Sequence, residues 1–331
     1  MPETTWSAWF DCGTTNTRLY LIDEKGEFLF GGAKAIGSRN VAIAGTAEVL
    51  SLVMAELFQQ ALEQFAITSE AVECIYASGM ITSAYGLMEI PHQVVPVSAQ
   101  TLRAGMKNVY VQALGRSVHL IAGVRTCADE WRFAGNVRGE ETEVFGAAAT
   151  LEERGRCSDG IYVLPGSHTQ ILCLQKGRIE DICSLFTGEL FHALQEETIL
   201  SDTLKHTPDH VEPEFVRMGC RDGSALGINR ALYLCHSNQV FDRFTPAQRY
   251  SYAEGVVHSG VMQSLEQTAL RCGSKHPQVV MVCDQFHWEI YSILLQDSCL
   301  QEIVWLPPSK PGCFGVRGLR SIVGNERVHY E

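Results

Sequence analysis

The sequence predicts a mixed α/β protein built from two related domains. Apolar strand-like runs alternate with helical patterns along the chain, which is typical of the α/β class. A hairpin pattern near the start returns past the middle of the chain, and such internal similarity indicates a duplicated domain. The length of 331 residues also favours two domains, since a domain usually takes about 100–200 residues.

The first predicted elements are short strands joined by polar turns, followed by a helix. The strands are Ser7–Asp11, Thr17–Ile22 and Glu27–Gly31, the last two joined by an Asp-Glu-Lys-Gly turn. The helix is expected from Thr46, as its N-cap, to Phe65, because apolar residues recur on one face. The further elements expected, in chain order, are strands at Val72–Ala77, Gln93–Val97 and Val118–Ile121, helices at Glu140–Glu153, Glu189–Leu200 (N-cap Thr187) and Arg249–Cys272, a strand at Gln278–Cys283, a helix at Trp288–Leu295, a strand at Glu302–Leu306 and a helix at Phe314–Val323.

The repeated hairpin lies at Ser7–Phe28 and again at Gly160–Asp181. Each copy has an apolar strand, a loop of Gly and hydroxyl residues, a second apolar strand, a Lys-Gly turn and a third strand. A charged break at Glu152–Asp159 lies between the copies. We therefore expect domains at 1–152 and 153–331.

Charge and composition exclude several classes of protein. The 26 Lys and Arg against 38 Asp and Glu give a formal net charge of −12, which disfavours a nucleic-acid polymer or an anionic membrane as partner. No apolar stretch approaches the ~20 residues that cross a bilayer, and the first residues lack the pattern of a signal peptide. The twelve scattered cysteines form no CxxC and predict reduced, buried thiols. We expect a cytoplasmic protein.

Two Gly- and hydroxyl-rich loops are candidate phosphate sites. The first holds Gly13, Thr14, Thr15 and Asn16, because a turn of this composition lines up backbone N–H groups that suit phosphate oxygens. The residues beside it add two charges: Asp11 as a Mg²⁺ ligand and Arg18 as a cation for the phosphates. An ordinary polar hairpin is the alternative.

The second loop offers the same chemistry with Gly166, Ser167, His168 and Thr169. Thr187, Gly188 and Glu189 form a helix start whose N–H groups suit an anion, with an ordinary N-cap as the alternative.

A carboxylate-rich segment is the candidate catalytic group. Arg138 is followed by Gly139 and then Glu140, Glu141 and Glu143. Phosphoryl transfer to an alcohol uses a carboxylate that orients the hydroxyl, and an arginine beside it suits a carboxylate or phosphate. The alternative is that acidic residues simply complement the helix dipole.

Several motifs together resemble one enzyme family. RGEETEVFGA (Arg138–Ala147), LPGSHTQIL (Leu164–Leu172) and LFTGELFHAL (Leu185–Leu194) are similar to the 2-dehydro-3-deoxygalactonokinases of the actin-like, hexokinase-like ATPase superfamily. DCGTTNTRLYL, SGMITSAYGLMEIPH (Ser78–His92) and GVRGLRSI (Gly315–Ile322) follow in the same order, so the resemblance spans nearly the whole chain.

The resemblance implies two RNase H-like domains facing across a cleft, and transfer of the γ-phosphoryl group of ATP, with Mg²⁺, to the 6-hydroxyl of 2-dehydro-3-deoxygalactonate or a similar sugar acid. It implies that the two loops are the phosphate-1 and phosphate-2 hairpins, with adenosine in the C-terminal domain. Glu140 or Glu141 would be the base, and Arg138 would bind substrate or phosphate. Ser78, Gly79, Met80 and Thr187–Glu189 would bind the sugar acid. A homodimer is the candidate assembly.

Three positions depart from the family pattern, and they motivate an alternative function. Gln170 stands where a lysine is usual, Asn136 where an aspartate is expected, and Asp284 in a loop that is usually Gly-rich. The alternative is a catalytically degenerate, kinase-like binding or regulatory protein on the same fold. A phosphatase of the superfamily is a third reading.

Overall fold

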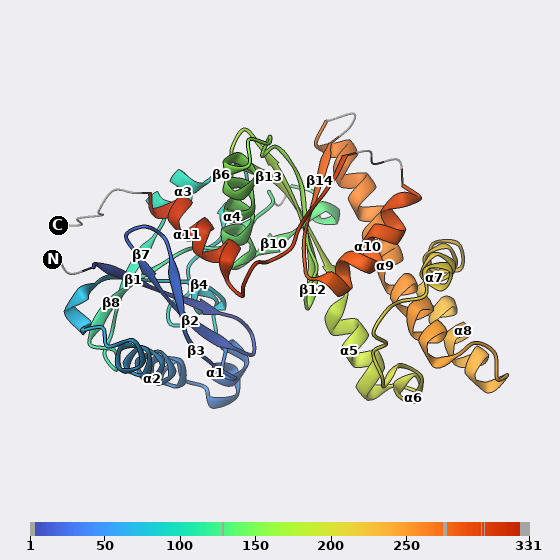
Figure 1. Cartoon of the computed structure of the whole chain (residues 1–331), viewed down its shortest axis with the longest axis horizontal. Coiled ribbons are helices and arrows are strands. Elements are labelled where there is room, and N and C mark those ends of the chain that lie inside the picture. The colour runs from blue at the N-terminus through green and yellow to red at the C-terminus, as the bar shows by residue number, and fades with distance from the viewer. Residues whose placement is uncertain (1–3, 128, 274–276, 299, 301, 325–331) are drawn as a thin grey trace. The chain divides into compact units, whose positions relative to one another are not determined.

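The structure, a computed structural model, divides into two compact units (Figure 1). It describes residues 4–127, 129–273, 277–298, 300 and 302–324. The first unit comprises residues 1–158, 175–180 and 309–331, and the second comprises 159–174 and 181–308.

The first unit carries a six-stranded sheet, a small three-stranded sheet and five α-helices within the described residues. Its strands are β1 (Trp6–Cys12), β2 (Thr17–Asp23), β3 (Phe28–Lys34), β4 (Val72–Gly79), β5 (Gln93–Val94), β6 (Val97–Ser98), β7 (Lys107–Val111), β8 (Arg116–Leu120), β9 (Val124–Arg125) and β10 (Asn136–Val137). Its α-helices are α1 (Ser38–Ala44), α2 (Glu48–Phe65), α3 (Ala99–Ala104), α4 (Glu140–Glu153) and α11 (Cys313–Val323), with 3₁₀ turns at Ser69–Ala71, Met80–Thr82 and Trp131–Phe133.

The main sheet of this unit has the order β3-β2-β1-β4-β8-β7. β1 is antiparallel to β2 and parallel to β4, with Asp11 opposite both Arg18 and Ser78. Alternate residues of β1 face opposite sides. Ala8, Phe10 and Cys12 join the core under α2, whereas Trp9 stacks on Tyr20 and lies against α11. Helices therefore cover both faces of this sheet (Figure 1).

Glycines allow α4 and α11 to pack with their backbones in close approach. A Cβ on Gly146 of α4 would lie 1.8 Å from the Phe314 carbonyl oxygen, and one on Gly318 of α11 would lie 1.6 Å from the Thr142 carbonyl oxygen. No flexible side chain separates the helices at either point. This packing fixes α4, and with it the start of the helix that carries the candidate carboxylates.

The second unit carries the rest of the helices and its own sheet. Its strands are β11 (Gly160–Leu164), β12 (His168–Gln175), β13 (Arg178–Phe186), β14 (Gln278–Val282) and β15 (Glu302–Leu306). Its helices are α5 (Gly188–Glu197), α6 (Ser201–Leu204), α7 (Pro213–Leu226), α8 (Ile228–Val240), α9 (Pro246–Arg271) and α10 (Gln285–Gln296). Gln175–Glu180, at the turn from β12 to β13, groups with the first unit, where Arg178 and Ile179 pair with β6.

The strand order of the second unit repeats that of the first. Its sheet runs β13-β12-β11-β14-β15, with β11 antiparallel to β12 and parallel to β14. The corresponding strands of the first unit, β3-β2-β1-β4-β8, stand in the same order, with β1 likewise antiparallel to β2 and parallel to β4. The duplicated hairpin and the α/β class expected from the sequence are thus both present.

The boundaries differ from the predicted ones at three points. The first break falls after Ser158 rather than Glu152, and α11 returns to the first unit because it packs on α4. Thr46 does not cap α2: its hydroxyl accepts from the Glu48 N–H at 3.2 Å and Ala47 takes the N-cap position. α7 and α8 were not predicted.

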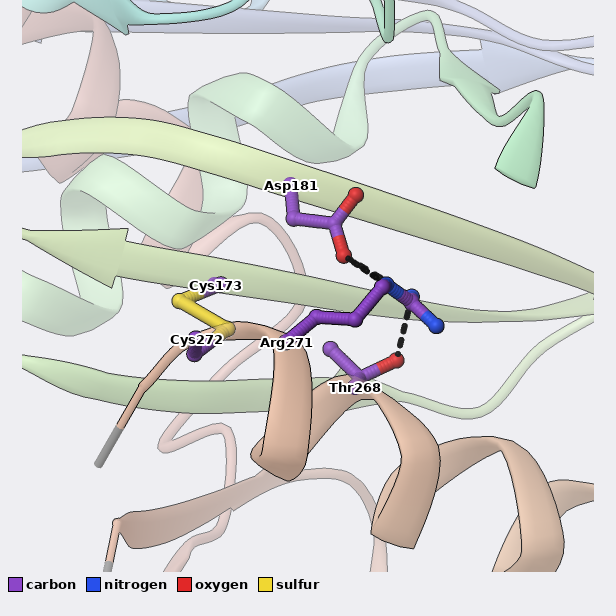
Figure 2. Close-up of a disulfide and its surroundings, with 5 residues drawn as sticks. All are labelled: Cys173, Asp181, Thr268, Arg271 and Cys272. Carbon is purple, nitrogen blue, oxygen red and sulfur yellow. Dashed lines mark hydrogen bonds and ion pairs between the residues drawn. A yellow bond between two sulfur atoms is a disulfide. The ribbon is translucent and has the colours of Figure 1, made fainter. Parts of the chain in front are cut away.

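The cysteine interpretation is wrong for one pair. Cys173 in β12 and Cys272 after α9 form a disulfide across 99 residues of sequence, with Cα atoms 6.7 Å apart (Figure 2). Beside it, Arg271 donates to Asp181 at 2.9 Å and to Thr268 at 3.0 Å. Spacing along the chain gives no sign of this pairing, because folding alone brings β12 to the end of α9.

We expect Gly146→Ala to destabilise the protein by about 2–4 kcal/mol, because the added methyl overlaps the α11 backbone. Gly260→Ala is the matched control: this glycine is also helical, and a Cβ there meets nothing within 4 Å among the described residues. Alanine should be neutral or stabilise by about 0.5–1 kcal/mol at that position. Urea unfolding measures both variants. Equal stability of the two variants would contradict the close helix approach.

Candidate active site

The first candidate loop is the tight turn between β1 and β2. The Gly13 N–H donates to the Asn16 carbonyl at 2.8 Å, and the side chains of Thr14 and Thr15 are exposed. The start of α1 braces the turn, because the Arg39 N–H donates to the Thr14 carbonyl at 3.0 Å. A Cβ on Gly37 would lie 2.4 Å from the Gly13 carbonyl oxygen, so only glycine fits there. The loop is an exposed, braced turn that can meet a ligand.

Asp11 and Arg18 form an ion pair at the base of this turn. Arg18 Nη1 lies 3.1 Å from Asp11 Oδ2 across the β1–β2 register, and both side chains keep partial solvent contact. Burial raises the pKa of the Asp11 carboxyl above its usual range, and Arg18 partly offsets this. The pair places one carboxylate and one cation where β1 ends and the turn begins.

The start of α4 carries a fully buried carboxyl group. Glu141 is 0 % exposed, and its Oε2 accepts from the Gly139 N–H at 2.7 Å. Burial, then repulsion from Glu140, raises the pKa of Glu141 to about 8. A carboxyl group with a pKa near neutrality can both accept and return a proton at physiological pH. Glu140 is half-buried and accepts from the Arg138 N–H at 3.1 Å.

The charges of the first turn act on the start of α4 within the same unit. Desolvation and then repulsion from Asp11, Glu140 and Glu141 raise the pKa of Glu143. Its side chain is exposed, so repulsion among the carboxylates is the stronger physical effect. The structure thus gathers Asp11, Arg18 and the acidic start of α4, which are far apart in the chain, into one electrostatic cluster.

Glycines let the candidate sugar-binding segment, Ser78–Met80, approach this cluster. Gly79, at the end of β4, has φ +86° and pairs with Cys12 of β1. A Cβ on Gly139, where φ is +112°, would lie 3.5 Å from the Gly79 Cα. Met80 follows in a 3₁₀ turn and is partly exposed. Ser78 is fully buried and its Oγ accepts from the Trp9 indole at 3.0 Å, so its hydroxyl has a core partner. A sugar-binding role for this segment stays a prediction.

Arg138 lies beside this segment with its guanidinium already engaged. Nη1 donates to the Thr82 hydroxyl at 2.6 Å, and Nη2 donates to the Ile90 carbonyl at 3.0 Å and to His92 Nδ1 at 3.3 Å. Burial and the neighbouring arginines Arg138 and Arg125 lower the pKa of His92 to about 4. The imidazole is therefore neutral near pH 7. Because Arg138 only donates, Nδ1 accepts and the proton lies on Nε2. The sequence had not singled out His92.

The second candidate loop joins β11 to β12 and meets the start of α5. Gly166, Ser167 and His168 are exposed, whereas Thr169 is fully buried. The Glu189 N–H donates to the Ser167 carbonyl at 2.8 Å. A Cβ on Gly188 would lie 2.3 Å from the Gly166 carbonyl oxygen, so glycine is required at the start of α5. The segment predicted for substrate thus abuts the one predicted for phosphate.

The His168 side chain already has a partner, Glu189. Its Nε2 lies 3.1 Å from Glu189 Oε2, and both side chains are about half exposed. An exposed pair of this kind contributes little stability and can be exchanged for a ligand.

The structure gives each of the three departing positions a local description. Asp284 is the N-cap of α10: its Oδ1 accepts from the His287 N–H at 2.9 Å and lies 2.9 Å from His287 Nδ1. This role explains an aspartate at that position on structural grounds. Gln170 is buried, and its Oε1 makes no hydrogen bond within the described part of the chain. Asn136 lies in β10 opposite Arg125.

The carboxylates of the first unit are chemically suited to Mg²⁺. Magnesium binds through one or two carboxylates, with waters and substrate phosphates completing its shell. Asp11 supplies such an oxygen, and the repulsion that it shares with Glu143 is what a divalent cation would relieve. Among the residues that the structure describes, no group of three or more His, Cys, Asp or Glu forms a ready metal cage. No described helix is long and apolar enough to cross a membrane.

Comparison with protein families gives a match over most of the chain. Residues 11–304 match the family model described as 2-keto-3-deoxy-galactonokinase. Among curated proteins, the chain is 28% identical over 191 residues to a Rhizobium meliloti (strain 1021) protein designated a probable 2-dehydro-3-deoxygalactonokinase, and 26% identical over 126 residues to the 2-dehydro-3-deoxygalactonokinase of Escherichia coli (strain K12). These matches cover 58% and 38% of this chain, and they span 56% and 39% of the relatives' own lengths.

Comparison with solved structures gives the fold. A Sinorhizobium meliloti protein to which the same kinase activity is attributed superposes with a TM-score of 0.70 at 20% identity, covering 96% of both chains. The activator of 2-hydroxyisocaproyl-CoA dehydratase from Clostridium difficile, solved with bound ADPNP, superposes with a TM-score of 0.50 at 11% identity, covering 96% of this chain and 94% of its own. The chain therefore has the α/β fold of the actin-like ATPases and sugar kinases, as the sequence predicted.

The raised pKa of Glu141 predicts how stability depends on pH. The folded protein keeps a proton on this carboxyl up to a pKa of about 8, whereas the unfolded chain loses it near the ordinary glutamate pKa of 4.5. The contribution of Glu141 is therefore fully present below about pH 4.5 and is lost as the pH rises to about 8. Glu141→Gln should lose less stability than the parent between pH 5 and pH 8 in urea unfolding. Parallel curves for the two proteins would show that Glu141 ionises normally.

Proposed function

Because this chain belongs to the 2-keto-3-deoxy-galactonokinase family, we propose that it is a kinase that transfers the γ-phosphoryl group of ATP to a sugar acid. The proposed acceptor is the 6-hydroxyl of 2-dehydro-3-deoxygalactonate or of a similar 2-keto-3-deoxy sugar acid. The observation that carries the proposal is the cluster in the first unit, where the braced turn Gly13–Asn16 lies with Asp11, Arg18 and the acidic start of α4.

The phosphate-binding elements proposed are the two turns. Backbone N–H groups of Thr14–Asn16, and those of Gly166–Ser167 with Gly188, suit phosphate oxygens, whereas the Gly13 and Glu189 N–H groups already donate to backbone carbonyls of the two turns. Such backbone donors also answer the net charge of −12, because they attract an anion locally whatever the distant surface charge. Mg²⁺ bound to ATP would neutralise phosphate charge beside Asp11, and Arg18 would share in this.

The proposed base is Glu141 or Glu140. Either carboxylate would orient the acceptor hydroxyl and take its proton as the bond to phosphorus forms. Glu141 has the pKa suited to this step, about 8, but its side chain is buried. Glu140 is the more accessible of the two. Arg138 and the segment Ser78–Met80 are proposed to border the sugar acid, and adenosine is proposed to bind in the second unit near Val282–His287.

The degenerate-protein alternative is not favoured. The family match extends through all three departing positions, and Asp284 has a capping role that needs no loss of function. The phosphatase reading lacks a specific observation in its support.

The proposed activity is tested by coupling ADP formation to NADH oxidation with purified protein, Mg-ATP and a panel of 2-keto-3-deoxy sugar acids. We expect sugar-acid-dependent turnover at about 1–100 s⁻¹. Phosphate release without an acceptor would favour a phosphatase instead. No stimulation by any member of the panel would overturn the proposal.

Separate Gln variants of Glu140 and Glu141 identify the base. The variant that lacks the base should lose kcat by about 100-fold or more with little change in the dissociation constant of Mg-ATP. Glu152→Gln is the matched control, since this glutamate is exposed at the other end of the same helix. It should leave kcat unchanged. Loss of stability without loss of kcat in both test variants would assign the two glutamates to helix capping alone.

A further inference from the structure

A buried chain of polar side chains runs from the second turn into the core of the second unit. Thr187 Oγ1 lies 2.9 Å from Thr169 Oγ1, which lies 3.4 Å from the Tyr291 hydroxyl. That hydroxyl lies 3.0 Å from His258 Nδ1, and His258 Nε2 lies 3.3 Å from Glu254 Oε2. This network thus joins the turn to α10, through Tyr291, and to α9, through His258 and Glu254. Tyr291 is 122 residues from Thr169 along the sequence.

All five members are almost fully buried. Their exposed fractions are 3 % for Thr187, 0 % for Thr169 and Tyr291, 5 % for His258 and 6 % for Glu254. Burying an ionisable pair and three hydroxyl groups is costly unless every partner is met, so such networks are rigid. Tyr250 adds a further hydrogen bond to Glu254. An apolar core at these positions would avoid the cost, which points to a role beyond packing.

The hydroxyl group of Thr187, which would normally cap α5, contacts the network instead. Thr187 is the N-cap residue, and a threonine there usually accepts from an N–H in the first helical turn. Here Thr187 makes no side-chain cap hydrogen bond, because its hydroxyl is directed to Thr169. The first N–H groups of a helix have no partner within the helix. The Glu189 N–H donates instead to the Ser167 carbonyl at 2.8 Å, so the start of α5 is bonded directly to the second turn.

Each hydroxyl group of this network has a partner within it. The Thr169 hydroxyl lies between those of Thr187 and Tyr291, and the Tyr291 hydroxyl lies between Thr169 and His258. These side chains are thus engaged with one another, and backbone N–H groups are what remains for a ligand.

We propose that Tyr291, His258 and Glu254 are positioning residues for the second phosphate turn: through Thr169 and Thr187 they hold Gly166–Ser167 against the start of α5. This role rests on the proposed function, since it assumes that phosphate oxygens of ATP bind there. The three residues act through the two threonines rather than by touching the nucleotide.

Tyr291→Phe tests the proposal by removing a single hydroxyl group while keeping the ring. Tyr252→Phe is the matched control: it is also a buried tyrosine of the second unit, and its hydroxyl donates to Asp222 at 2.8 Å outside the network. Hydrogen exchange measured by mass spectrometry follows the amides of residues 166–170 and 188–190, and calorimetry gives the dissociation constant of Mg-ATP. Loss of one hydrogen bond should speed exchange and raise the dissociation constant by about three- to tenfold in Tyr291→Phe. Neither quantity should change in Tyr252→Phe.

A second pair of variants covers the case in which Tyr291→Phe does not fold. Thr169→Ser keeps a hydroxyl group in the chain, whereas Thr169→Val removes it at almost constant volume. Serine should preserve the parent's exchange and Mg-ATP affinity, and valine should lose both. Unchanged exchange in Tyr291→Phe, or equal effects of serine and valine, would overturn the positioning role. A parent protein that binds no Mg-ATP would overturn the proposed function, and the exchange comparison would still decide whether the network holds the turn.

Discussion

The parallel pairing of a hairpin's first strand with a later strand is the constraint on which both units depend. β1 pairs with β4 in the first unit and β11 with β14 in the second. Because parallel neighbours end at the same edge of a sheet, each pairing places a Gly-rich turn beside whatever follows the partner strand. In the first unit that neighbour is Gly79–Met80, against which Gly139 and the start of α4 pack. The candidate chemistry therefore follows from topology.

Glycine makes this convergence sterically possible. Gly37, Gly79 and Gly188 each lie where a Cβ would come within 2.6 Å of a backbone oxygen belonging to a turn or to β1. A larger residue at any of them would push the candidate groups apart. Glycines have the same effect between α4 and α11, where Gly146 and Gly318 allow the two helix backbones to come into contact. Close approach of main chain to main chain thus sets the geometry before any side chain contributes.

The ionisable groups lie in different places relative to the candidate turns in the two units. In the first, burial and then repulsion from Glu140 raise the pKa of Glu141 to about 8, and Asp11 and Glu143 repel one another. The second places a buried ionisable pair, Glu254 and His258, away from the turn and connects the two through hydroxyl groups. A cation and a transferable proton suit the first arrangement, and a phosphate on backbone N–H groups suits the second.

The sequence by itself determined the α/β class, the duplicated hairpin, both turns, the span of α4 and the family resemblance, because these depend on local periodicity and short motifs. It missed α7 and α8, the return of α11 to the first unit and the pairing of Cys173 with Cys272. It also left Arg138 without its partners Thr82 and His92, and Thr169 without Tyr291. Only the tertiary structure decided these, because each contact joins residues tens to more than a hundred positions apart, and burial and hydrogen bonding across such distances leave no periodic trace in the chain.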